Sequence, residues 1–319
     1  MKNTSQLILK TLLLCAASQS IAAIESDVVY PYNTTETLTT KISGVENYNS
    51  TSVTYDNLWL YNADLTLAST GKNITIGTAN TKSLSVGAGG YVVAVEGNSS
   101  LTIKNGAKFI IYSSASLGII NGADTFDLTV ESNGVFRAHK LFSNAKKTTL
   151  NLLTETAISQ DKMTVGAAGG QKEIVVNMNC NQKFALDSRD NTIYSFNITN
   201  DACLTVTGVS LLNADSGNVT IKIADGLVNG SLLFLTDASY YTNEYSWNSE
   251  TSELSITADS TKSQIASFVD ADGNALKNLT WTAVEGGYTL SASAVPEPAH
   301  WAAIIGAIAM SLAIYRRRK

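Results

Sequence analysis

Short apolar-threonine-apolar triplets recur along the chain and constrain its fold more than any other feature. The triplets, or close variants of them, begin at Ile74, Leu101, Leu128, Leu150, Ile174, Ile198 and Val219. The intervals between them are 27, 27, 22, 24, 24 and 21 residues. Most of these triplets alternate apolar and polar residues, as a half-buried β-strand does, whereas 174–176 (IVV) and 198–200 (ITN) are looser variants. A repeat in the low twenties predicts stacked coils, in which each coil covers the apolar face of the next.

Two copies of the repeat are alike beyond the triplet. Residues 101–109 (LTIKNGAKF) and 128–136 (LTVESNGVF) share a strand, an Asn-Gly turn and a second short strand. Asn and Gly supply the positive φ that such a corner needs. We therefore expect an all-β chain with a parallel β-helix, or solenoid, over residues 24–230. Its inward-facing residues would include Ile76, Ile103, Val130 and Ile221.

An antiparallel β-sandwich is the alternative fold, because Thr and Leu are frequent enough for some triplets to recur by chance. Composition agrees with either all-β fold. Asn, Thr, Ser, Gly and Ala alternate with Val, Ile and Leu, which is typical of short strands joined by tight turns. Of the three prolines, only Pro31 lies outside the C-terminal segment described below.

After residue 230 the pattern changes to three expected hairpins. Their turns lie at 248–251, 270–274 and 285–287, and each is rich in Asp, Asn, Ser or Gly between runs of alternating apolar residues. We expect residues 231–294 to form a β-hairpin cap, which would cover the open C-terminal end of the coil and its exposed strand edges.

The C-terminal segment 295–319 (VPEPAHWAAIIGAIAMSLAIYRRRK) has three parts in a fixed order. The first part, Pro296-Glu297-Pro298, interrupts regular secondary structure, because proline fixes φ and disfavours helical geometry in the residue before it. The apolar run 299–315 would span roughly 25 Å as a helix, close to the hydrocarbon thickness of a membrane. The basic residues Arg316, Arg317, Arg318 and Lys319 follow, and the positive-inside rule would keep them in the cytoplasm. We expect a transmembrane helix here, and a buried C-terminal helix is the alternative.

In order and spacing, Val295-Pro296-Glu297-Pro298, the apolar run and the terminal arginines resemble the PEP-CTERM sorting signal of exported Gram-negative proteins. The resemblance covers only these 25 residues. It implies that an exosortase, a membrane-embedded cysteine protease-like enzyme, recognises Pro296-Glu297-Pro298 and removes the tail. It also implies a surface or extracellular destination, often in bacteria that make exopolysaccharide.

The N-terminal residues 1–23 resemble a signal peptide for the Sec export machinery. Lys2 and Lys10 precede a short apolar core at 11–17, and Ser20-Ile21-Ala22 offers small residues for a cleavage site. A lipoprotein anchored at Cys15 is the alternative, although Leu14 stands where lipid attachment needs a small side chain. We expect the protein to be exported, held by the inner membrane before processing, and then placed on the cell surface or outside the cell.

The body between these segments is acidic. The chain has 22 basic and 27 acidic residues, and six of the basic ones lie in the two terminal segments. An acidic body repels phosphate backbones, so nucleic acid is not an expected partner. Cys180 and Cys203 are the cysteines of the body, one repeat apart. In an oxidising compartment they can bridge neighbouring coils, and we predict this disulfide; two cysteines without a histidine cluster make a poor metal site.

Catalytic motifs are sparse. No GxSxG, HExxH, P-loop or nucleotide fingerprint occurs, and His139 is the one histidine of the body, expected at the surface. Asp270-x-Asp272-x-Asn274 begins like a calcium loop, but Ala275 and Trp281 occupy the positions of the required Gly and Glu. A hairpin turn is the favoured reading and calcium the alternative. We expect no catalytic residue, metal or cofactor.

The repeated LTI/LTV–Asn-Gly pattern and the late Tyr-x-Trp hairpin weakly resemble the passenger parts of autotransporter-like surface proteins. Together with the sorting signal, this resemblance implies a structural or adhesive protein of the surface or extracellular matrix. Its partners would be the exosortase and export machinery, and exopolysaccharide or other surface proteins. A polysaccharide-cleaving enzyme on the same scaffold is the alternative, because such enzymes use clustered carboxylates on one face of a β-helix.

Overall fold

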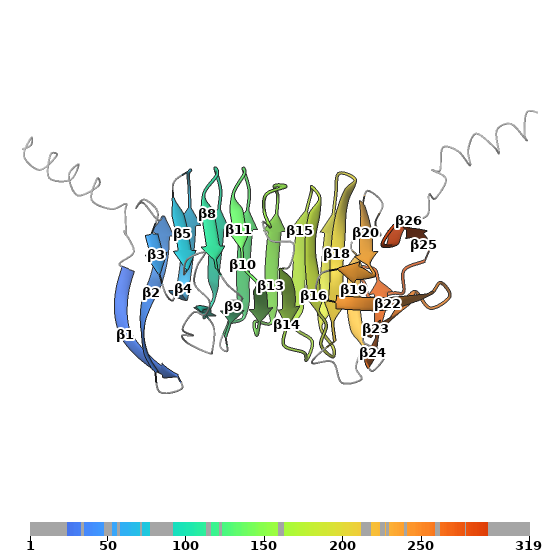
Figure 1. Cartoon of the computed structure of the whole chain (residues 1–319), viewed down its shortest axis with the longest axis horizontal. Helices are drawn as coiled ribbons and strands as arrows, with labels where there is room; N and C mark the ends of the chain where they lie inside the picture. The colour runs from blue at the N-terminus through green and yellow to red at the C-terminus, as the bar shows by residue number, and fades with distance from the viewer. Residues whose placement is uncertain are drawn as a thin grey trace, which may run out of the picture.

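A computed structural model describes most of the body. The described residues are 24–32, 35–47, 53–55, 58–70, 72–76, 92–112, 116–120, 123–158, 163–211, 218–223, 227, 230–238, 241–258, 262–277 and 279–292. Among them every regular element is a β-strand and none is a helix. The strands form an elongated stack that runs from β1 at one end to β26 at the other (Figure 1).

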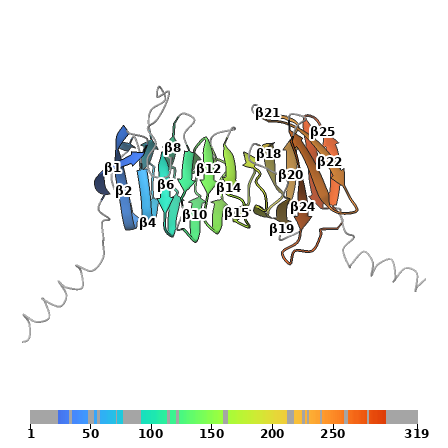
Figure 2. The ribbon, with the colours of Figure 1, turned by 90° about the horizontal axis from the view of Figure 1, so that it is seen from below.

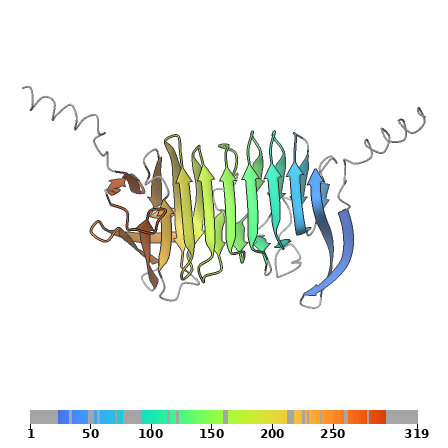
Figure 3. The same ribbon diagram turned by 180° about the vertical axis from the view of Figure 1, so that it is seen from behind.

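One side of the stack is a ladder of parallel strands, which we call the first ladder. Successive strands pair in the order of the chain, with one strand from each coil. Its members are β4 (Leu58–Leu67), β7 (Ser99–Ile103), β10 (Thr125–Val130), β13 (Lys147–Leu152), β15 (Glu173–Met178), β17 (Ile193–Ile198), β19 (Val219–Ile223) and β24 (Lys262–Val269). Figure 3 shows such a row of parallel strands from behind.

A second ladder is formed by the strands that follow in each coil, and it is also parallel. After the start of β4, its members are β6 (Val93–Glu96), β9 (Ser116–Ile119), β12 (Lys140–Ser143), β14 (Thr164–Ala167), β16 (Gln182–Asp187), β18 (Ala202–Ser210) and β20 (Gly230–Leu235). In Figure 2 the strands of successive coils lie side by side along the stack.

A third ladder closes the coils only in the N-terminal half. It contains β3 (Val53–Tyr55), β5 (Asn73–Ile76), β8 (Lys108–Ile111) and β11 (Val135–Arg137). It then shrinks to a single bridge between Phe136 and Ile158. The number of strands does not set the length of a coil. Leu128 and Leu150 are 22 residues apart across a coil that contains β11, whereas Leu150 and Val176 are 26 residues apart across the next coil, which has no described third strand. The loops between the strands therefore account for the variation in the repeat.

The core is a column of stacked apolar side chains inside the coils. In the first ladder, Leu101 pairs with Leu128 and Leu128 with Leu150. The column continues as Val176, Phe196 and Ile223, and all six side chains are 1% exposed or less. The expected inward residues Ile76, Ile103, Val130 and Ile221 are buried as well. Full burial of each such side chain contributes about 1.5–3 kcal/mol, so the stacked column holds the coils together.

The mostly parallel, β-helix-like stack agrees with the expected architecture, but the predicted register is wrong at two triplets. The Ile74 triplet lies in the third ladder; residues 65–67 (LTL) take its place in the first. Leu150 pairs with Val176, two residues beyond the predicted Ile174. Because inward positions in 173–178 are apolar at every second residue, the triplet alone did not fix which of them faces Leu150.

The Asn-Gly turns of the two similar copies were also predicted, and the turn of the second copy lies one residue earlier than expected. In the first copy, Asn105 and Gly106 have the expected positive φ of 52° and 75°. In the second copy Ser132 and Asn133 take those roles, with φ of 51° and 62°. Gly134 serves another purpose: a Cβ there would lie 2.4 Å from the carbonyl oxygen of Ile103 on the coil below.

Both ends of the stack depart from parallel pairing. At the start, β1 (Ile24–Tyr32) pairs antiparallel with β2 (Thr35–Asn47), which joins β4. At the other end, β22 (Tyr241–Asn248) and β23 (Glu253–Ala258) form a hairpin as expected, and β23 pairs antiparallel with β24. β22 also pairs with the short β21 (Asp237–Ala238).

The last hairpin, β25 (Leu279–Val284) and β26 (Gly287–Ala292), adds antiparallel to β20. The turn expected at 270–274 closes through a bridge between Val269 and Ala275, but the next described strand, β25, pairs with β26 and not with β24. β20 and β24 both extend parallel ladders, so the stack continues past residue 230 into the segment expected to form the β-hairpin cap.

Candidate functional site

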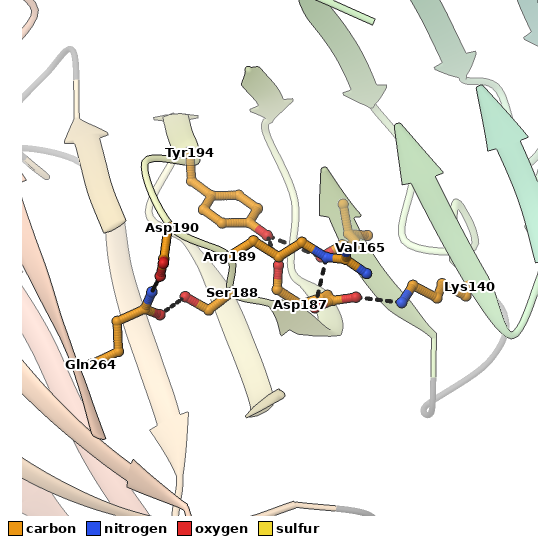
Figure 4. Close-up of polar contacts among 8 residues, drawn as sticks. All are labelled: Lys140, Val165, Asp187, Ser188, Arg189, Asp190, Tyr194 and Gln264. Atoms are coloured by element: carbon orange, nitrogen blue, oxygen red, sulfur yellow. Dashed lines mark hydrogen bonds and ion pairs between the residues drawn. The ribbon is translucent and has the colours of Figure 1, made fainter. Parts of the chain in front are cut away.

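A group of charged side chains surrounds Asp187, at the end of β16 (Figure 4). Its side chain is 1% exposed and forms an ion pair with Lys140 of β12, 47 residues earlier in the chain. The guanidinium Nε of Arg189 lies 3.7 Å from the other carboxylate oxygen. Both cations are 27% exposed, so this buried carboxylate holds two basic side chains at the surface.

The register of the second ladder positions this group. Phe142 pairs with Gly166 and Gly166 with Asp187, so the three residues form one outward-facing row across neighbouring coils. Lys140 Nζ lies 5.1 Å and Arg189 Cζ 4.4 Å from the centre of the Phe142 ring. Both distances are within the range of cation–π attraction. The aromatic ring and the carboxylate therefore hold the two cations jointly.

Tyr194 connects the backbone of Asp187, at the start of the loop between β16 and β17 (Ile193–Ile198), to the preceding coil. Its hydroxyl donates to the carbonyl oxygen of Asp187 at 2.8 Å, and the carbonyl oxygen of Val165 lies 3.2 Å away. Burial raises the pKa of this phenol well above its usual range; the negative charge of Asp187 adds to the shift and Arg189 opposes it. Tyr194 therefore stays protonated at neutral pH and acts as a hydrogen-bond donor to the backbone.

A short polar chain links the cluster to the last coil (Figure 4). Ser188 donates a hydrogen bond to the amide oxygen of Gln264, which belongs to β24. The amide nitrogen of Gln264 donates to Asp190 Oδ1 at 3.2 Å. The segment 187–190 thus contacts β12 and β24 through its own side chains, and Tyr194 links its backbone to Val165 of β14. These contacts connect neighbouring coils to one another.

A second regular polar feature lies on the outside of the first ladder, which we call the amide row. Asn151 donates to the hydroxyl of Thr129 at 3.0 Å, Asn177 to Asn151 at 2.7 Å, and Asn197 to Asn177 at 2.6 Å. Thr102 and Thr66 continue the same position toward the N-terminal end. Each side chain of this row is half-buried. The outside of the stack is thus polar and uncharged along this line.

The predicted sorting signal lies outside the described residues, as do the N-terminal signal and Cys15. Val295, Pro296, Glu297, Pro298, Arg316, Arg317, Arg318 and Lys319 all belong to it. Within the described part of the chain, no helix has the length and apolar character needed to cross a membrane.

Cys180 and Cys203 lie on adjacent coils, as predicted. Cys203 N–H donates to the side chain of Asn181, the residue after Cys180, at 2.9 Å. Both cysteines are half-buried free thiols in this structure. Cys180 Sγ accepts a hydrogen bond from Gln182 at 3.3 Å. The disulfide between them stays a prediction.

The other candidates occupy ordinary positions. His139 is half-buried just before β12, and its carbonyl accepts from Thr164 N–H. Asp270 accepts from the backbone N–H groups of Asp272 and Asn274, both at 2.9 Å, as in an Asx turn. Hydrogen bonds from Asn274 hold the pKa of Asp270 below its ordinary value. No three His, Cys, Asp or Glu residues among those described are grouped to hold a metal.

Sequence reasoning missed Lys140, Asp187, Arg189 and Tyr194. They are spread over three strands and a loop with no fixed spacing, so no local motif marks them. The one available signal was the interruption of an apolar strand, FALD at 184–187, by a carboxylate. Such a residue is rarely buried unless it is paired.

Neither the models of known protein families nor the curated proteins contain a match to this chain. The roles given to Asp187, Lys140 and Arg189 rest on the contacts described above.

Proposed function

We propose that this chain is a structural or adhesive protein of the bacterial surface or extracellular matrix. The observation that carries the proposal is the stack itself. Parallel coils with a continuous apolar core form a long, stiff body whose described outer row is half-buried Thr and Asn. Such a body suits a spacer or a repeated binding surface, because each coil presents the same kind of side chain about 4.8 Å from the last.

Export and sorting form the second part of the proposal. The resemblance of residues 295–319 to the PEP-CTERM signal supports handling by an exosortase, with the tail held in the inner membrane until it is removed. The basic residues would stay cytoplasmic and the body outside. The partners of the exported form would be exopolysaccharide or other surface proteins.

Fractionation of the producing cells tests the sorting step. The Pro296→Ala/Glu297→Ala protein should accumulate in the inner membrane, since its apolar run still inserts, while the native protein reaches the surface. The intact mass of the surface form should lack Arg316 to Lys319. Normal surface display of the double variant, or a surface form that keeps these residues, would remove the sorting proposal.

Cosedimentation with purified extracellular matrix tests the structural role. The native protein should sediment with matrix from the producing cells, and the Asp187→Asn variant should lose matrix binding only as far as it loses folded protein. We propose a non-enzymatic role because Asp187 is enclosed and paired with cations, whereas polysaccharide hydrolysis needs two carboxylates facing a substrate. Cleavage of the matrix polysaccharide by the native protein, abolished by a single Asp→Asn change, would overturn that role.

A further inference from the structure

β25 is an edge strand at the C-terminal end of the stack (Figure 1). Within the described part of the chain its only strand partner is β26, and the pairing runs from Leu279 to Val284 without a bulge. Thr282, Ala283 and Val284 are exposed, and Val284, at 43%, has the largest exposed fraction of the described large apolar side chains. Within the described residues, no strand pairs with the opposite edge of β25.

The edge strands at the two ends of the stack differ in sequence and in the regularity of their pairing. The sequence of β1, the edge strand at the N-terminal end, contains Glu25, Asp27 and Pro31, and its pairing with β2 is irregular between Val28 and Tyr30. Charge, proline and bulges are the features that prevent edge strands from pairing with other chains. β25, with the sequence LTWTAV, has none of these features.

The hairpin that carries β25 is held rigidly by aromatic stacking. The Trp281 ring lies between Tyr288 and Trp247, with centroid distances of 5.0 and 5.9 Å and interplanar angles of 11° and 17°. The Tyr245 ring packs edge-on against Trp281 at 6.3 Å. A strand fixed in this way loses little conformational freedom on pairing.

We propose that β25 is a self-association site, where β25 of a second copy of this chain pairs with it antiparallel across a two-fold axis. This interaction goes beyond the proposed surface function and does not depend on export. An uncharged edge suits a second copy of itself, because self-pairing brings every charge on the strand opposite an identical charge, and β25 has none.

The residue pattern of β25 is compatible with that symmetry. A two-fold axis perpendicular to the sheet pairs residues that lie on the same face of both strands. Residues on one face, Leu279, Trp281 and Ala283, would therefore meet one another. Thr280, Thr282 and Val284 would meet on the other face. Each face of the joined sheet would then continue without a mismatch between apolar and polar rows.

The turn at Glu285-Gly286 indicates which backbone groups point outward. Val284 pairs with Gly287 across this two-residue turn, and residues flanking such a turn bond to each other. Since bonding alternates along an antiparallel ladder, the N–H groups of Leu279, Trp281 and Ala283 face the open edge. Ala283→Pro would remove one outward donor without removing a bond to β26.

Sedimentation of the full chain in mild detergent, over a concentration series, tests the site. The native protein and the matched control Ala283→Val should form dimers, and Ala283→Pro should raise the dimer dissociation constant at least about tenfold, with an unchanged circular dichroism spectrum. A second pair of variants tests the same edge without proline, in case the Ala283→Pro protein fails to fold. Thr282→Lys/Val284→Lys should give the same weakening, and Ser249→Lys/Thr251→Lys, with the same added charge in the exposed β22–β23 turn, should not.

A native protein that stays monomeric up to about 100 µM would overturn the proposal, since weaker pairing carries less than about 5.5 kcal/mol of binding free energy. Dimers of equal strength in all five proteins would also overturn it, because association would then lie elsewhere, for example in the C-terminal apolar run. Neither result would affect the sorting and matrix experiments.

Discussion

Gly166 lies directly beside Asp187 on the neighbouring coil, and a Cβ atom added to Gly166 would stand 2.5 Å from the Cβ of Asp187. The close approach lets the carboxylate sit nearly enclosed between Lys140 and Arg189. The position of Asp187 on β16 therefore depends on glycine at position 166 of β14.

Gly166→Ala should destabilise the fold by about 1–3 kcal/mol, because the added methyl group forces the coils apart locally. Urea unfolding followed by circular dichroism measures the change. The same substitution in an Asp187→Asn background serves as the control. Since the contact is with the Cβ of residue 187, the cost should persist there; a cost that vanishes with the charge would contradict the steric explanation.

Asn177→Asp, in the amide row, should lower the free energy of unfolding by about 1–3 kcal/mol. Its Nδ2 donates to Asn151 Oδ1 at 2.7 Å, and a carboxylate would place two oxygens against each other at that point. The hydrogen bond from Asn197 would remain. Ser249→Asp adds the same charge in an exposed turn and should change the free energy of unfolding by no more than about 0.5 kcal/mol. Equal costs for the two variants would show that the amide row contributes nothing.

The sequence predicted the stacked-coil fold because inward positions of a β-helix must be apolar on every coil. Leu101, Leu128 and Leu150 satisfy that condition, each at the start of an apolar-polar-apolar triplet, and their predicted register was correct. Register failed at Ile174 because apolar residues occupy several inward positions of that strand, so a shift of two residues leaves the pattern unchanged.

The Asp187 cluster could not be predicted in the same way. Its members meet because Lys140 and Asp187 lie two coils apart in space although 47 residues separate them in the chain. The coil length varies between these positions, so the pairing depends on a register that the sequence did not determine. Only the buried carboxylate in an apolar strand hinted that a partner was needed.

Ile103→Asp should abolish the folded state under ordinary conditions. Ile103 is fully buried and stacks between Leu67 and Val130, so an unpaired carboxylate there costs several kcal/mol, comparable to the total stability of about 5–15 kcal/mol. Lys104→Ala, one residue on and half-exposed, should cost about 0.5 kcal/mol or less. Similar effects at the two positions, in a soluble-yield and thermal-unfolding comparison, would contradict the assignment of inside and outside.

Cys180 and Cys203 should form a disulfide when the native protein is treated with a mild oxidant, since they lie on adjacent coils. Closing a loop of about 23 residues should raise the free energy of unfolding by about 3 kcal/mol. Intact mass should fall by two hydrogens, and the Cys180→Ser protein should show neither change. Two titratable thiols remaining after oxidation of the folded native protein would contradict the pairing.

Alkaline unfolding should be governed by Tyr194 and Tyr245. Burial raises the pKa of both phenols, and the negative charge of Asp187 adds to the shift at Tyr194. The folded state therefore keeps these protons when the unfolded chain, with ordinary tyrosine pKa values near 10, begins to lose them. Stability that is present below about pH 10 should fall as the pH rises beyond that value.

Phenylalanine variants separate the two contributions to this loss. Tyr194→Phe should cost about 1 kcal/mol at pH 7 through the hydrogen bond to the Asp187 carbonyl, and should flatten the decline in stability above pH 10. Tyr245→Phe should flatten it as well, with its pH 7 cost set by the 3.2 Å bond to the Leu235 carbonyl. Urea titrations at pH 7 and at several alkaline values measure both effects. If the double variant loses stability above pH 10 as steeply as the native protein does, these phenols are not the groups whose ionisation unfolds the stack.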